Sequence, residues 1–112
     1  MIKEKNMYRP LPKSLTISKS SIDGLGLFAK EDMEQGRNLG MSHLKIGNTI
    51  FRTPLGGFIN HSNTPNCVKG ELRMTDEDLK GESYKYKKWN VITSQDIKAG
   101  DELTVRYTFY NV

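Results

Sequence analysis

Polar side chains follow an apolar pair near the middle of the chain, where residues 58–67 read Phe-Ile-Asn-His-Ser-Asn-Thr-Pro-Asn-Cys. A core strand does not normally place an amide, an imidazole and a hydroxyl in succession beside Phe-Ile. A buried polar group that lacks a hydrogen-bond partner costs about 1–3 kcal/mol. Asn60 and His61 therefore either satisfy neighbouring groups of the protein or present their polar atoms to a ligand. A histidine in this setting is more often structural, and the segment alone leaves both interpretations open.

A glycine pair lies upstream of this segment, where Gly24 and Gly26 flank Leu25 and Leu-Phe-Ala follows. Glycine has no Cβ, so its backbone can approach a ligand closely and can adopt a positive φ angle. A single Gly-x-Gly is more often only a turn. The loop is therefore a candidate ligand-binding element, and this assignment depends on the other motifs.

A tyrosine ends the third segment, in which residues 102–107 read Glu-Leu-Thr-Val-Arg-Tyr. A tyrosine in a terminal strand usually buries its ring and keeps its hydroxyl in water. The hydroxyl of Tyr107 can also orient a reacting group if the chain folds to bring the three segments together.

Short strands and glycine turns are the elements that must position these residues, and they predict a mostly β fold. We expect strands at residues 15–18, 27–30, 68–74, 84–93 and 102–110, and a strand pair over 45–52 that turns at Gly47-Asn48. Pro54 and the Gly56-Gly57 pair are expected to interrupt any regular element, and residues 76–83 are expected to form an exposed loop.

The order and content of the three motifs resemble the SET domain family of protein lysine methyltransferases. The resemblance covers roughly residues 13 to 110. It implies a SET-domain, β-clip-like fold of several small β-sheets with a knot-like crossing near the C-terminus. It also divides the chain into an N-terminal arm, residues 1–12, and a single SET domain, residues 13–112. The short length is similar to minimal viral, phage or bacterial members.

The resemblance implies S-adenosyl-L-methionine as the cofactor and transfer of its methyl group to a lysine amine of a protein substrate. The backbone of Gly24, Leu25 and Gly26 would hold the methionine part of the cofactor. The side chain of Asn60 would contact the amino-acid end, and the backbone of His61 would pair with the adenine edge.

Tyr107 takes the catalytic position in this resemblance, where its hydroxyl would orient the lysine amine and the sulfonium methyl. Val105 stands where the family often has Phe or Tyr, and its smaller side chain predicts that more than one methyl group can be added. Phe109 and Tyr110 are candidates for the wall of the lysine channel, although core packing explains them equally well.

Two alternatives to the enzyme stay open. One is a SET-like module that binds a peptide without turnover. The other is a basic nucleic-acid-binding domain, because residues 84–89 interleave lysines with aromatic side chains. The net charge of +4 and a pI near 9.2 fit such a domain. We favour the simpler interpretation of an amphipathic strand whose lysines face solvent.

Composition limits the remaining possibilities. With 112 residues, the chain forms one domain with a modest core. The single cysteine, Cys67, excludes an intrachain disulfide and a multi-cysteine zinc site, so we expect no metal. The sequence has no apolar signal-peptide region and no membrane-spanning stretch, and an intracellular setting is expected. The segment before Phe58, which grips the substrate in the family, is short, so a second copy of the chain in a homodimer is one way to complete the channel.

Overall fold

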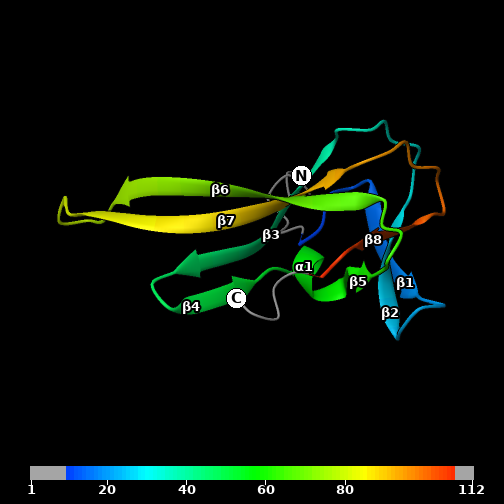
Figure 1. Ribbon diagram of the computed structural model, residues 1–112, viewed down its shortest axis with the longest axis horizontal. Helices are drawn as coiled ribbons and strands as arrows, with labels where there is room; N and C mark the ends of the chain where they lie inside the picture. Colours follow the sequence, from blue (N-terminus) through cyan, green and yellow to red (C-terminus); the bar gives the residue numbers. More distant parts are fainter. Residues whose placement is uncertain (1–9, 108–112) are drawn as a thin grey trace, which may run out of the picture.

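A computed structural model of the protein describes residues 10–107 and shows two four-stranded β-sheets with one short helix beside them (Figure 1). The strand order is β1-β2-β8-β5 in the first sheet and β4-β3-β7-β6 in the second. The mostly β architecture of small sheets predicted from the sequence is confirmed.

The first sheet gathers strands from both ends and from the middle of the described chain. It contains β1 (Leu15–Lys19), β2 (Leu25–Ala29), β5 (Asn60–His61) and β8 (Glu102–Val105). β2 pairs antiparallel with β1 and with β8, whereas β5 pairs parallel with β8. This order places the glycine loop, which leads into β2, close to the Asn-His pair and to the strand that leads to Tyr107.

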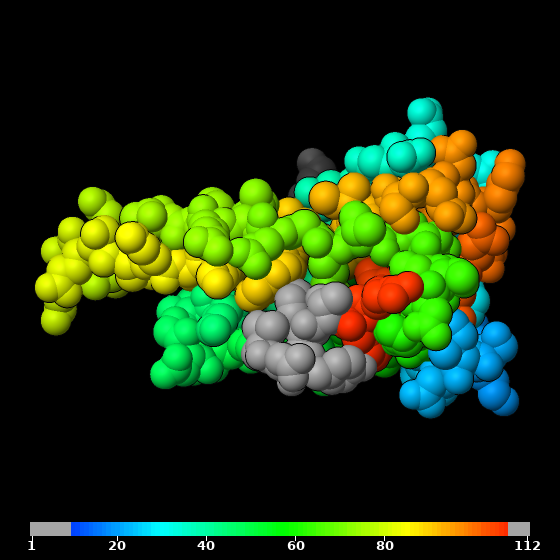
Figure 2. All heavy atoms as spheres, in the orientation of Figure 1, coloured from blue at the N-terminus to red at the C-terminus, as the bar shows by residue number. Residues whose placement is uncertain are grey.

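The second sheet consists of two hairpins. β3 (Asn38–Ile46) and β4 (Thr49–Arg52) form the shorter hairpin, and β6 (Cys67–Glu77) and β7 (Ser83–Thr93) form the longer one. Figure 2 shows the end of the β6–β7 hairpin projecting beyond the rest of the protein. Most residues of this projecting part, between positions 71 and 85, are exposed.

Helix α1 (Pro54–Phe58) corrects one sequence expectation, because a regular element does form in this glycine-rich stretch. Thr53 caps the helix: its hydroxyl accepts a hydrogen bond from the Gly56 amide at 3.2 Å. Proline is well tolerated in the first turn, where its missing N–H would have no helical partner. A Cβ at Gly56 would collide with the carbonyl oxygen of Ser42, so glycine allows the helix to lie directly against β3.

The hydrophobic core lies where the two sheets and α1 meet. Its fully buried members include Leu27, Leu103, Val91 and Ile59, each with at most 1% of its surface exposed. In the first sheet, Leu27 of β2 stands directly opposite Leu103 of β8. Apolar burial of this kind contributes about 25 cal/mol per Å² and fixes the relative position of the strands.

Element boundaries differ from the sequence expectations mainly in four places. β2 begins at Leu25, inside the predicted glycine loop, rather than at residue 27. β6 continues to Glu77, so the exposed connection to β7 is shorter than the predicted loop 76–83. β3 begins at Asn38, well before the predicted pair over 45–52, although the turn at Gly47 is confirmed with φ of 59°. β8 ends at Val105 rather than continuing to 110.

Several sequence expectations concern residues outside the described range 10–107, and others are not tested by the strands and helix described here. The N-terminal arm falls almost wholly outside residues 10–107, and so do Phe109 and Tyr110. The domain division and the knot-like crossing stay predictions. Within the described residues, the five-residue α1 is far too short to cross a membrane.

Candidate active site

Gly26 makes room for a carboxylate. A Cβ at this position would collide with the carboxylate of Glu102 and would also press on Ser20. Gly24 has a different reason to be glycine, because its φ of 45° lies in the left-handed region and no atom lies within 4 Å of where a Cβ would be. The two glycines therefore shape the loop in separate ways, one by close approach and one by backbone conformation.

A hydrogen-bonded cluster joins the glycine loop to the Asn-His segment. The amide nitrogen of Asn60 donates to Glu102 Oε2 at 2.9 Å and to Ser20 Oγ at 3.1 Å, and it lies 3.1 Å and 3.4 Å from the carbonyl oxygens of Asp23 and Leu25. The Ser20 hydroxyl donates to the Glu102 carboxylate at 2.8 Å. The amide nitrogen of Asn60 is thus fully engaged, whereas among residues 10–107 no hydrogen bond to its oxygen Oδ1 is formed.

His61 offers its backbone at the open edge of the first sheet. The Ser62 amide donates to the Val105 carbonyl at 2.9 Å, so the peptide groups of His61, one residue earlier, point away from β8. The ring has a structural role, since Nδ1 accepts a hydrogen bond from the Tyr107 amide at 2.8 Å. A neutral ring therefore carries its proton on Nε2, which lies 3.2 Å from Oδ1 of Asn63.

Tyr107 lies between the two sheets. Its hydroxyl donates to the Ile59 carbonyl at 2.9 Å, and its ring centroid lies 5.2 Å from that of His61. On the side of the second sheet, the ammonium of Lys69 lies 5.8 Å from the centre of the Tyr107 ring. The hydroxyl proton of Tyr107 therefore points to Ile59.

Asn66 fixes the strand that leads to Tyr107. Its amide nitrogen donates to the Glu102 carbonyl at 2.9 Å, and its amide oxygen accepts from the Thr104 amide at 2.9 Å. One side chain thus takes the place of a neighbouring strand along part of β8. Arg106 adds a further link by donating to the Asn63 carbonyl at 2.9 Å.

Burial and neighbouring charges shape the electrostatics beside Tyr107. Burial lowers the pKa of Lys69 to about 8. Burial, followed by the positive charges of Lys69 and Arg52, lowers the pKa of His43 to about 4. Burial also raises the pKa of the Cys67 thiol to about 12. The thiol is therefore protonated at neutral pH, and within the described residues no three His, Cys, Asp or Glu side chains gather as metal ligands do.

Comparison with known proteins identifies the family to which the chain belongs. The sequence model of the family described as SET domain matches residues 42–108, which is more than half of the chain. The chain belongs to the SET domain family. The matched stretch contains Asn60, His61 and Tyr107, but it begins after the glycine loop.

Individual relatives agree with this assignment. The chain is 29% identical to histone-lysine N-methyltransferase 2D of Homo sapiens and of Mus musculus, over 83% of its own length. The match spans only about 2% of the length of these curated relatives. A crystal structure of a candidate histone methyltransferase of Plasmodium falciparum superposes with a TM-score of 0.62 at 20% identity, over 88% of this chain and 96% of that one. This structural likeness shows that the SET fold is shared.

The SET fold brings most of the residues predicted for the site into one region. The loop 24–26, Asn60, His61 and Tyr107 are linked by the contacts described above. Val105 pairs with His61 next to this region, but its side chain is 1% exposed and belongs to the hydrophobic core. Its influence on the number of methyl groups stays a prediction, as do the roles assigned to the other residues.

Four residues of this SET site were not singled out from the sequence. Ser20, Asn66 and Glu102 make its polar framework, and only their partners in the folded chain reveal this. Lys69 could have been found, because it lies two residues after the buried Cys67 on a strand and so shares its face. An inward-facing lysine beside a core position is an unusual signal in a strand pattern.

Proposed function

We propose that this SET domain is an S-adenosylmethionine-dependent protein-lysine N-methyltransferase. The observation that carries the proposal is the position of Tyr107, which lies between the polar cluster around Asn60 and the half-buried face of the second sheet. A donor bound at the cluster and a lysine entering from the opposite side would both come close to the phenol oxygen.

The residues at the cluster fit the cofactor's chemistry. S-adenosylmethionine carries an ammonium group and a sulfonium group, and the cluster presents acceptors: the Glu102 carboxylate, Asn60 Oδ1 and the carbonyls of Asp23 and Leu25. The space beside Gly24 leaves the loop backbone accessible. The outward-facing peptide groups of His61 offer one donor and one acceptor, which complement the edge of an adenine. When bound, the cofactor supplies an activated methyl group on sulfur.

The chain's own residues would act mainly by positioning. The phenol oxygen of Tyr107 can accept a hydrogen bond from the substrate amine and so direct the amine's lone pair toward the donor. Orientation of reacting groups in line lowers a barrier by roughly 7–11 kcal/mol in favourable cases. The amine must be neutral to attack, and its usual pKa is about 10.4. Desolvation in the channel would lower that pKa, so no dedicated base is required.

A methyl-transfer assay tests the proposal. Purified protein is incubated with labelled S-adenosylmethionine and a lysate of its own source, beside Tyr107→Phe and the matched control Tyr86→Phe on the second sheet. We expect a labelled protein band with the wild type and with Tyr86→Phe, and its loss with Tyr107→Phe. Calorimetry should show cofactor binding by all three proteins.

Two results separate this proposal from the binding-module alternative. Cofactor binding without any labelled product would favour a module that does not turn over. Absence of cofactor binding in calorimetry would overturn the assignment of the cluster. Because Tyr107→Phe removes one hydrogen bond, urea unfolding should confirm that the variant loses no more than about 1.5 kcal/mol of stability.

A further inference from the structure

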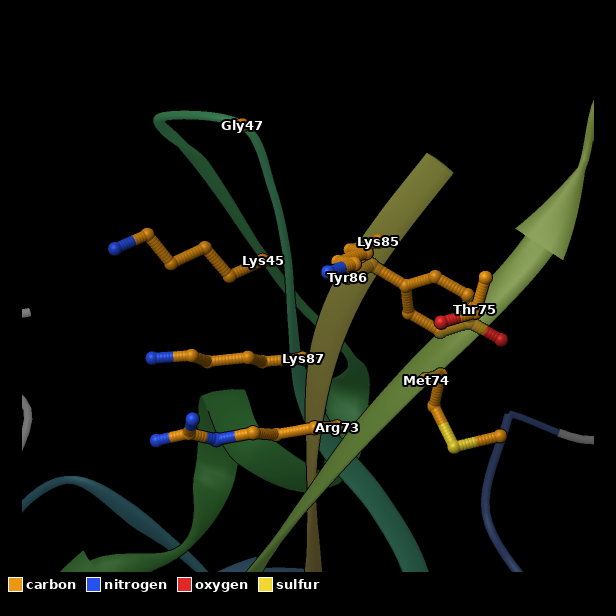
Figure 3. A pocket seen from close by; sticks show the side chains of 8 residues that line it. All are labelled: Lys45, Gly47, Arg73, Met74, Thr75, Lys85, Tyr86 and Lys87. Atoms are coloured by element: carbon orange, nitrogen blue, oxygen red, sulfur yellow. The ribbon is translucent and has the colours of Figure 1, made fainter. Parts of the chain in front are cut away.

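A row of three positive charges crosses the second sheet. Lys45 of β3 stands directly opposite Lys87 of β7, and Lys87 stands directly opposite Arg73 of β6. Residues that pair directly share a face of a sheet, and Figure 3 shows these three side chains extending side by side in one direction. They line a cavity of about 530 Å³ at this end of the sheet.

Such a row is unfavourable for the isolated protein. Like charges directly opposite one another on neighbouring strands are destabilising. Among the described residues, Glu71 forms an ion pair with Arg73 at 3.2 Å, but the Arg73 side chain is 79% exposed and such surface pairs contribute little. The row therefore keeps a positive field that a bound anion would neutralise.

The positive face continues to the candidate active site. Lys69 lies four residues before Arg73 on the same strand and so faces the same side. Its ammonium lies 5.8 Å from the centre of the Tyr107 ring. Burial, and after it the positive charges of Lys69 and Arg52, lower the pKa of His43, so both cations lie near that ring. Glu71 lies between Lys69 and Arg73 on this face and pairs with Arg73. A ligand that reaches Tyr107 across the face would therefore meet two cationic areas, the row and Lys69, with one carboxylate between them.

The two tyrosines of the same strand lie on the other face, and Trp89, on the cationic face, is buried. Tyr84 and Tyr86 alternate with Lys85 and Lys87 along β7, and Figure 3 shows the Tyr86 ring directed away from Lys87. Proteins that bind single-stranded nucleic acid combine cations with aromatic stacking in one groove. The separation of the two groups favours an acidic peptide over a nucleic acid as the ligand.

We propose that this cationic face, made of Lys45, Lys69, Arg73 and Lys87, binds an acidic segment of the substrate protein beside the target lysine. The inference rests on the methyltransferase function proposed above and adds a substrate class to it. An extended strand advances about 3.3 Å per residue, so the row lies about 13 Å, or four residues, from the position of Lys69. The preferred substrate therefore carries Asp or Glu about four residues from its lysine.

This preference would distinguish the chain from an enzyme that acts on basic tails. A lysine flanked by arginines about four residues away would meet repulsion at the row and at Lys69, in addition to the positive charge of the bound cofactor. Electrostatic selection of this kind acts on the encounter and on the register of the substrate. It is also weakened by salt, because exposed charges are screened.

Three synthetic peptides test the proposal. Each has one central lysine, and the flanking positions about four residues away carry glutamates, glutamines or arginines. Methyl transfer from labelled S-adenosylmethionine should follow the order Glu, Gln, Arg, with about a tenfold or larger difference in kcat/KM between the first and the last at low salt. The difference should shrink as salt is raised. Equal kcat/KM for the three peptides would overturn the proposal while leaving the methyltransferase function intact.

Adjacent lysines on opposite faces provide a matched pair of variants. Lys87→Glu reverses one charge within the row and should reduce or invert the preference for the glutamate peptide. Lys88→Glu makes the same change on the other face, next to Leu72 and Leu44, and should leave the preference unchanged. An identical effect of both variants would point to net charge alone and would overturn the assignment of the face.

Fluorescence anisotropy measures the binding of the same peptides and does not depend on turnover. Tighter binding of the glutamate peptide without any methyl transfer would support the surface and overturn the proposed function. Tighter binding of a single-stranded oligonucleotide than of the glutamate peptide, lost in Lys87→Glu, would overturn the substrate class in favour of a nucleic acid.

Discussion

The two sheets of this SET domain use polar side chains in opposite ways. In the first sheet, polar groups bond to one another across long stretches of sequence, as Ser20 does with Glu102, 82 residues away. In the second sheet, cations stand beside cations on one face. The first arrangement is a rigid framework that depends on a few individual bonds. The second is a diffuse field that depends on the sum of several charges. Single substitutions should therefore have unequal effects in the two regions.

The largest expected effect is that of Asn66→Ala in the first sheet. The change leaves the Glu102 carbonyl and the Thr104 amide without their side-chain partner, and each buried loss costs about 1–3 kcal/mol. We expect a loss of about 3 kcal/mol in the free energy of unfolding, measured in urea, together with loss of methyl transfer because β8 positions Tyr107.

Asn63→Ala is the control for this prediction. The Asn63 side chain is exposed, and its oxygen meets the His61 ring at 3.2 Å. Its removal should cost less than about 1 kcal/mol. Equal losses for the two variants would show that Asn66 is not the residue that fixes β8.

Gly26→Ala should have the next largest effect and should exceed that of Gly24→Ala. An added Cβ at Gly26 collides with the Glu102 carboxylate and forces it away from Asn60, at an expected cost of about 2 kcal/mol. At Gly24 the Cβ meets open space, and only the positive φ opposes it, at about 1 kcal/mol. Calorimetric affinity for S-adenosylmethionine should fall more for Gly26→Ala.

A double-mutant cycle with Glu102→Ala sharpens this comparison. If the collision is the cause, the effects of Gly26→Ala and Glu102→Ala will not add, because the smaller side chain removes the obstacle. Additive effects would place the cost of Gly26→Ala in the backbone instead.

Local sequence patterns predicted some features of the two sheets, whereas features that depend on contacts between distant segments could not be predicted. The SET motifs identified the glycine loop, Asn60, His61 and Tyr107 because those residues lie in recognisable local patterns. Strand β7 was predicted within one residue, since its aromatic and β-branched composition is a local property. Information of this kind depends on neighbours in the chain.

Features that depend on contacts between distant segments escaped prediction. The bond between Ser20 and Glu102 and the two bonds from Asn66 to β8 exist only once the strands are assembled. The charged row of the second sheet depends on register, which sets Lys87 between Lys45 and Arg73. Helix α1 forms although two of its five residues are glycines, because Thr53 caps its N-terminus and the helix packs against β3.

The pH dependence of stability provides a third prediction, this time in the second sheet. Burial and the charges of Lys69 and Arg52 lower the pKa of His43 from 6.5 to about 4. Between these values the unfolded chain binds the proton and the folded chain does not, so this contribution to stability falls as the pH falls from about 6.5 to 4. His43→Asn should remove a contribution on the order of 1–2 kcal/mol over that range.

Urea unfolding of wild type and variant at pH 7 and at pH 4 measures this effect. Subtracting the two unfolding free energies removes the contribution of the carboxylates, which titrate in both proteins. The difference in unfolding free energy between the two proteins should change with pH in favour of the variant at pH 4. Parallel pH profiles would mean that burial and the neighbouring cations do not lower the pKa of His43 in the folded protein.

The smallest expected effect lies on the apolar face of the second sheet, opposite the charged row. Leu72 is 44% exposed and lies beside Lys88, so Leu72→Thr should change the unfolding free energy by less than about 0.5 kcal/mol. Val91, on the same sheet but fully buried, should lose more than about 1 kcal/mol as Val91→Thr, because the new hydroxyl enters the core. A loss for Leu72→Thr as large as that for Val91→Thr would mean that this face is covered in solution. Both faces of the second sheet would then be buried surfaces, and its exposed apolar residues would contribute to stability as those of the core do.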